Sequence, residues 1–184
     1  MADAIAVWHA EHVDYSRLLN VLEEQVLAFH VGRTPNYHLM RDVVSYLRGF
    51  PDRYHHPRED IAFARLVERN PALELPINRL LQEHRVIAAA GEELLERLNQ
   101  MIEGASIARA TLEAAADAYL VYYRHHLATE ERVILPIAAE LLTPEDLDII
   151  ASAVSPTPDP LFGERVDKRY RELRERIAAS AGVA

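Results

Sequence analysis

The chain of 184 residues contains no cysteine. This absence excludes a disulfide scaffold, a cysteine-ligated iron–sulfur cluster, a zinc ribbon and a thiol nucleophile. Any metal ion bound by this protein must therefore be held by histidine and carboxylate side chains.

Long apolar runs are also missing. No stretch approaches the roughly 18 uninterrupted apolar residues that a membrane-spanning helix needs, so we expect no such helix. The first dozen residues carry acidic side chains and two histidines where a signal peptide would have a basic region followed by an apolar one. These features predict a cytoplasmic protein without a membrane partner.

Positive charge is scarce. Lysine and arginine together number 20 against 29 aspartates and glutamates, which gives a formal net charge of −9. This balance is unfavourable for binding a polyanion, so nucleic acid is not an expected partner. Hydrophobic residues make up 49% of the chain and charged residues 27%, as is typical of a globular domain with a sizeable core.

Helical periodicity dominates what is present, because apolar residues recur at intervals of three and four and the six glycines mostly fall between these stretches. We predict an all-α fold with an antiparallel up-down four-helix bundle over residues 1–142. A helical extension over residues 143–184 should add two helices that pack on the bundle or on a partner, such as a second copy in a homodimer. The bundle helices are expected from the N-terminus to about residue 32, then over 37–69, 76–103 and 106–142.

Prolines mark two of the expected irregularities. Pro51 and Pro57 lie within the second expected helix, and each removes a backbone donor and clashes with the preceding turn. We expect a kink or a break around the first and a smaller irregularity at the second. Beyond the bundle, Thr143 and Pro144 predict the N-cap and first position of a short helix that ends near residue 153.

The nine histidines form a pattern together with glutamates. Two of the expected helices carry a histidine and, four residues later, a glutamate, a spacing that places both on one helix face. The other two helices each carry one histidine that directly follows a glutamate, and the pieces repeat after 71 or 72 residues. Four imidazoles and two carboxylates that are able to bridge suit two iron ions, with manganese or zinc as substitutes. The predicted metal ligands are His12, His55, Glu59, His84, His126 and Glu130.

Adjacent histidines occur in both His-x3-Glu motifs, so the register needs a choice. His125 has only a threonine four residues later, which makes His126 the clearer ligand. In the first motif, His56 has an aspartate at that position, whereas His55 has Glu59, and the apolar residues after this glutamate match those after the second motif's glutamate. We choose His55 and retain His56 as the alternative.

Together these motifs resemble the hemerythrin-like HHE cation-binding proteins, which are four-helix bundles with a non-haem di-iron centre. The resemblance covers roughly residues 5–142. It implies that the six predicted ligands hold two irons, with both glutamates bridging and an oxo or hydroxo bridge in the oxidised state. It is carried, in order, by the EH of Glu11-His12, the HHPRED that begins at His55, the EH of Glu83-His84, and the HHLATEE that begins at His125 with Leu135-Pro136 following.

The sequence departs from the oxygen-carrying hemerythrins in two places. Those proteins have a further histidine where this chain has Ala88, and they end with an aspartate five residues after the last histidine instead of Glu130 four residues after it. Two histidines per iron leave more coordination positions open, so simple reversible oxygen storage is not expected. The resemblance instead implies a di-iron protein that binds peroxide, nitric oxide or dioxygen.

Two functions follow from this hypothesis. In the first, the protein reduces such oxidants in oxidative or nitrosative stress defence, as a peroxidase or a nitric oxide-detoxifying enzyme with an unknown electron donor. In the second, it is a non-catalytic iron or oxygen sensor or storage protein whose metal occupancy controls the C-terminal helices. Turnover of peroxide or nitric oxide would distinguish the two.

Several neighbours of the ligands have open roles. His9 could be an extra ligand, a support for a ligand or an exposed residue, and Asp52 is one candidate partner for the second nitrogen of His55. His30 and His38 lie outside the repeat and are interpreted as ordinary surface or core residues. The tyrosines around the two motifs could fill the core, hydrogen-bond a carboxylate or join the metal; they are Tyr54, Tyr119, Tyr122 and Tyr123.

Overall fold

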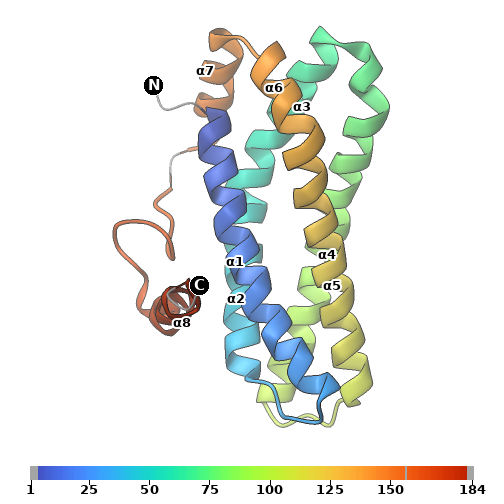
Figure 1. Ribbon diagram of the computed structural model, residues 1–184, viewed down its shortest axis with the longest axis vertical. Coiled ribbons are helices and arrows are strands. Elements are labelled where there is room, and N and C mark those ends of the chain that lie inside the picture. Colours follow the sequence, from blue (N-terminus) through green and yellow to red (C-terminus); the bar gives the residue numbers. More distant parts are fainter. Residues whose placement is uncertain (1–3, 156, 182–184) are drawn as a thin grey trace.

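A computed structural model describes residues 4–155 and 157–181, and within these residues every regular element is a helix (Figure 1). The all-α class predicted from the sequence is confirmed. The α-helices are α1 (Ala4–His30), α2 (Tyr37–Gly49), α3 (His56–Arg69), α4 (Glu74–Ile102), α5 (Arg109–Thr129), α6 (Leu135–Leu141), α7 (Pro144–Ala153) and α8 (Arg171–Ala181). Short π-helices cover Pro51–His55 and Glu130–Ile134, and 3-10 turns cover Pro71–Leu73 and Lys168–Tyr170.

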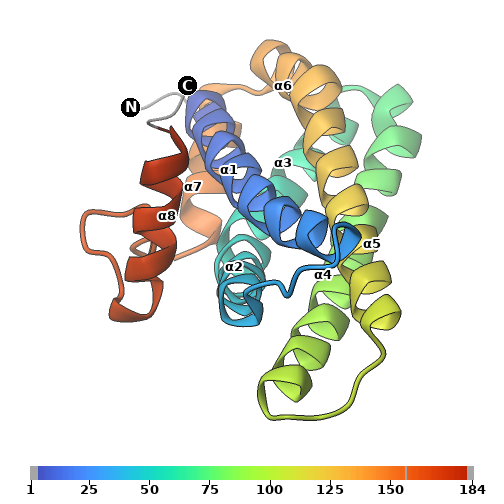
Figure 2. The ribbon, with the colours of Figure 1, turned by 60° about the horizontal axis from the view of Figure 1, so that its bottom comes forward.

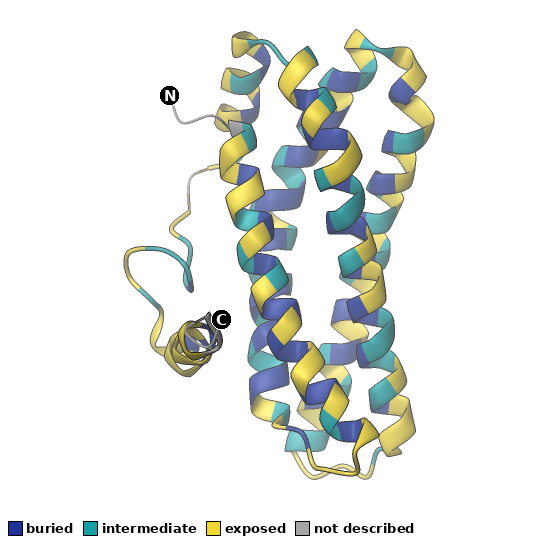
Figure 3. Cartoon of the chain, viewed as in Figure 1, coloured by how far each residue is buried: buried dark blue, intermediate teal, exposed yellow. Residues whose placement is uncertain are grey.

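The long helices pack side by side as a bundle. Helix α1 contacts α2 and α5, and α4 contacts the same two helices from the other side (Figures 1 and 2). Buried and exposed residues alternate around each long helix, so each presents one apolar stripe to the interior (Figure 3). The largest core cluster includes Leu18, Leu22, Val43, Leu47, Leu94 and Leu98.

The two π-helices interrupt the bundle at matching places. The first follows α2 and ends at His55, and α3 restarts with Pro57 in its first turn, where a missing N–H donor is tolerated. The break predicted around Pro51 is therefore present. The second begins at Glu130 and is followed by Pro136 in the first turn of α6. This interruption was not predicted, because residues 106–142 were expected to form one continuous helix.

The C-terminal residues add to the bundle. Thr143 is the N-cap of α7, as the sequence predicted, and it also forms a capping box with Asp146. Helix α7 packs against α3. Helix α8 begins at Arg171 and packs against α1 and α2. Leu173 and Ile177 of α8 belong to the main core cluster. Among the described residues, no helix combines the length and apolar character needed to cross a membrane.

Candidate metal centre

The structure brings the predicted ligands together inside the bundle. Helix α1 supplies the first histidine, α4 another, and the two interrupted helices each supply a histidine and a glutamate close to their π-helical segment. The centre lies between two parts of the core, because apolar clusters flank it on both sides along the helices. All six predicted ligands are buried, each with at most 7% of its surface exposed; they are His12, His55, Glu59, His84, His126 and Glu130.

Glu59 faces histidines from three other positions. Its Oε1 atom lies 3.3 Å from Nε2 of His12 and 3.1 Å from Nε2 of His55. Its Oε2 atom lies 3.6 Å from Nε2 of His84. The Nε2 atoms of His12 and His55 are themselves only 2.9 Å apart, so these nitrogens converge on one point beside the carboxylate.

Glu130, the second central glutamate, likewise faces three histidines. Its Oε1 atom lies 3.2 Å from Nε2 of His126 and 3.6 Å from Nε2 of His84. Its Oε2 atom lies 3.6 Å from Nε2 of His12. Each of the two carboxylates therefore spans two groups of imidazoles, one with His12 and His55 and one with His84 and His126.

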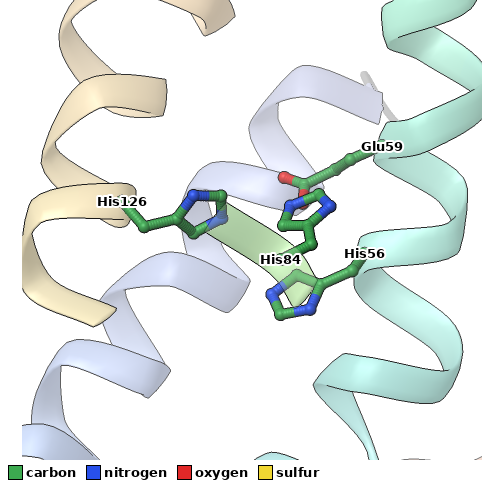
Figure 4. A group of neighbouring side chains, drawn as sticks. All are labelled: His56, Glu59, His84 and His126. Atoms are coloured by element: carbon green, nitrogen blue, oxygen red, sulfur yellow. The ribbon is translucent and has the colours of Figure 1, made fainter. Parts of the chain in front are cut away.

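His56 joins the second group. Its ring stacks on that of His84 with 4.3 Å between centroids, and lies edge-on to His126 at 5.6 Å (Figure 4). One ligand atom from each of His56, Glu59, His84 and His126 lies within 4.8 Å of the others, and the same holds for His12, His55 and Glu59. The alternatives His55 and His56 thus both lie at the centre, in two groups that share Glu59.

Every one of these histidines has a carboxylate at its second ring nitrogen. A carboxylate in this position fixes the orientation and tautomer of a metal-bound imidazole. Distances from Nδ1 to the nearest carboxylate oxygen are 2.7 Å for His12 and Glu131, 2.7 Å for His55 and Glu11, 2.7 Å for His84 and Asp60, 3.2 Å for His126 and Glu83, and 3.2 Å for His56 and Asp52.

Sequence reasoning missed most of these partners. Asp52 is not the partner of His55 that we considered; it lies beside His56 and also pairs with Arg48, whereas Glu11 of α1 reaches His55. The available signal was that an acidic residue directly adjoins four of the predicted ligands. Such a residue serves a histidine on another helix, which spacing along one helix does not show.

A family model for the hemerythrin HHE cation-binding domain matches residues 3–138. The chain belongs to this family. The match spans all six predicted ligands of this hemerythrin HHE domain and ends within α6. Membership implies cation binding, and the buried histidine and glutamate cluster is compatible with it. Neither a curated protein nor a solved structure gives a match.

Unpartnered polar atoms show that this hemerythrin HHE centre fits a metal. Burying a polar atom without a partner is costly, and a charged carboxylate oxygen most of all. Metal coordination would satisfy these atoms together. Within the described residues, buried atoms at the centre without a hydrogen-bond partner are Nε2 of His56, His84 and His126, Oε2 of Glu59, and both carboxylate oxygens of Glu130.

The carboxylates of the centre raise the pKa of two of its histidines and so favour their protonated forms. Burial disfavours the charged form of His55, but Glu59 and Glu11 outweigh burial and raise the pKa of His55 to about 9. Burial is likewise outweighed at His84, where the hydrogen bond to Asp60 and the nearby charges of both central glutamates raise the pKa to about 11. Burial prevails at His56 and lowers its pKa to about 4. Metal binding at this centre would therefore release protons from imidazolium groups.

Tyrosines border the centre on the side away from α6 and α7. Tyr15 lies edge-on to His55 with 5.1 Å between ring centroids, and Tyr123 lies 6.1 Å from His56. The hydroxyls of Tyr15, Tyr119 and Tyr123 are buried without a hydrogen-bond partner in the described structure. Tyr54 is half-buried. Tyr119 and Tyr123 belong to the largest core cluster, so both tyrosines help to fill the core.

Two predicted neighbours lie outside the centre. The side chain of His9 is 62% exposed and contacts Glu131, the residue that also contacts His12. His9 therefore lies at the surface, in contact with the carboxylate that also reaches His12. Tyr122 is 49% exposed on α5.

Proposed function

We propose that this hemerythrin HHE domain is a non-haem di-iron protein that binds small oxidants, namely peroxide, nitric oxide or dioxygen. The observation that carries the proposal is the geometry of Glu59 and Glu130. Each turns its two oxygens toward different groups of imidazoles, as a carboxylate that bridges two metal ions must. We also propose that residues 4–141 form an antiparallel up-down four-helix bundle around this pair.

The donor set suits iron. Imidazole nitrogens and carboxylate oxygens are the mixture that iron, manganese and zinc accept, and the chain offers no sulfur ligand from cysteine. His12 and His55 would hold one ion, and His84 and His126 the other, with Glu59 and Glu130 shared. His56 would give the second ion a third imidazole, so the two ions would differ in the number of open positions.

When bound as a ferrous pair, iron supplies the electrons that reduce such an oxidant. The protein's own contribution is to position the ligand side chains and to shield the centre from water. Carboxylates at Nδ1 hold the imidazoles, and the apolar residues around Phe63 exclude water from one side. On the other side, the unpaired hydroxyls of Tyr15 and Tyr123 can donate hydrogen bonds to a small bound molecule. No further protein nucleophile is needed.

The first test is metal content together with turnover. Anaerobically purified protein should carry two irons per chain and, as the ferrous form, should consume peroxide or nitric oxide with a change in its optical spectrum. Glu59→Gln removes a shared charged ligand and should lose most of the iron and the spectral change. Glu68→Gln, an exposed glutamate on the same helix, is the matched control. Iron content that is unchanged by Glu59→Gln would refute the proposed centre.

A second candidate function has one specific observation in its favour. Helix α7 packs on α3, the helix that carries Glu59, and Arg69 of α3 pairs with Asp146 of α7 at 2.6 Å. A change at the centre could reach residues 143–184 through this contact, as a sensor of iron or oxygen would require. The two functions differ in what metal removal does to this segment.

A further inference from the structure

We propose a second, peripheral site for a divalent metal ion, formed by His30, Glu113 and Asp117. It lies far from the centre described above, because His30 follows His12 by 18 residues on the same helix, or about 27 Å at about 1.5 Å per residue. The sequence did not indicate this site, because His30 lies outside the repeated histidine and glutamate motifs and its two partners lie on another helix.

Three donor atoms converge there from two helices. His30 lies in the last turn of α1, and its Nε2 atom is 2.9 Å from Oε1 of Glu113 on α5. Asp117 lies one turn further along α5, on the same face as Glu113. One ligand atom from each residue lies within 4.8 Å of the others. All three side chains are accessible to a hydrated ion, since His30 is exposed and both acids are partly exposed.

The local charges favour a cation. Two carboxylates at positions i and i+4 of a helix repel each other, and the carboxyl end of α1 adds a partial negative charge. The nearby guanidinium of Arg109 is engaged elsewhere: it donates to the carbonyls of Phe29 and Arg33 and covers the Phe29 ring. No ion pair for Asp117 occurs within residues 4–155 and 157–181, so a bound cation would relieve the repulsion.

The donor chemistry defines the class of ion. One imidazole nitrogen and two carboxylate oxygens suit zinc, manganese or ferrous iron, whereas cuprous copper prefers sulfur. Three protein ligands on a surface leave the remaining positions to water. The site would hold an exchangeable ion, in contrast to the enclosed central cluster.

Zinc titration of the iron-loaded full chain by calorimetry tests the inference. Wild type should bind one zinc ion beyond the iron already present. His30→Ala and Asp117→Asn should each weaken that event by at least about tenfold, because even the loss of a residue that only supports a ligand typically costs this much. His38→Ala, which removes an exposed histidine on α2 outside any such cluster, should leave it unchanged.

Iron content and circular dichroism of the same samples separate this inference from the proposed di-iron centre. Normal iron content with no zinc event in wild type would overturn the peripheral site alone. A zinc event that survives both His30→Ala and Asp117→Asn would overturn it as well. If iron is absent, the difference between wild type and His30→Ala still isolates the peripheral event from zinc bound at the centre.

Discussion

At the scale of single residues, the pairing of each histidine with a carboxylate distinguishes this centre from histidines that merely fill a core. Asp60 shows the principle, because its Oδ1 atom lies 2.7 Å from Nδ1 of His84 while its side chain is 47% exposed. It has little packing role, so its effect must pass through the imidazole that it orients.

Asp60→Asn therefore should weaken the centre without unfolding the protein. The amide can no longer provide the negative charge that strengthens His84 as a ligand, and loss of such a partner typically lowers metal affinity by about 10- to 100-fold. Iron release to a competing chelator should accelerate accordingly, while the melting temperature of the metal-free protein changes little. An unchanged release rate, with Glu68→Gln as the reference, would show that Asp60 does not support a ligand.

At the scale of helical elements, the start of α7 depends on one carboxylate. Asp146 accepts hydrogen bonds from the backbone of Thr143 and from Arg69, and these interactions hold the pKa of Asp146 below its usual value. A group whose pKa is lower in the folded state stabilises the fold above its unfolded pKa, and this contribution disappears as the pH falls through the folded pKa.

We expect Asp146→Asn to lower the free energy of unfolding at pH 7 by about 1 kcal/mol, a typical value for a lost N-cap interaction. The difference from wild type should shrink as the pH falls below about 4, where the wild-type carboxylate becomes protonated. Urea unfolding of the metal-free protein across this range measures it. Asp148→Asn, an exposed acid on the same helix, should show no such pH-dependent difference.

Helix spacing explains how much of the site the sequence could predict. The His55/Glu59 and His126/Glu130 pairs lie on one helix each, so a four-residue interval fixes their relative position before any tertiary contact forms. The place of His56 depends instead on a π-helix that ends beside it, which changes the helical register just before α3. Pro51 indicated that interruption, but no proline precedes the matching one at Glu130.

At the scale of the whole molecule, the described part of the chain forms one connected structure. Leu161, Leu173 and Ile177 from the C-terminal residues share a core cluster with Leu18 and Leu22 of α1. The same helix α1 carries His12. The bundle, its metal centre and the C-terminal helix are therefore expected to unfold in one transition.

Removing the metal should accordingly destabilise the entire fold. A ligand bound only by the folded state, at about 100 times its dissociation constant, adds about 2.7 kcal/mol, which corresponds to a melting temperature shift of about 5–10 °C for a chain of this size. Anaerobic chelation should produce this decrease in wild type and none in Glu59→Gln.

Because the C-terminal apolar residues are part of the core, limited proteolysis of the metal-free protein should cut residues 155–170 only as the whole domain unfolds. Cleavage there well below the melting temperature, and only after metal removal, would instead favour the sensor function over oxidant reduction.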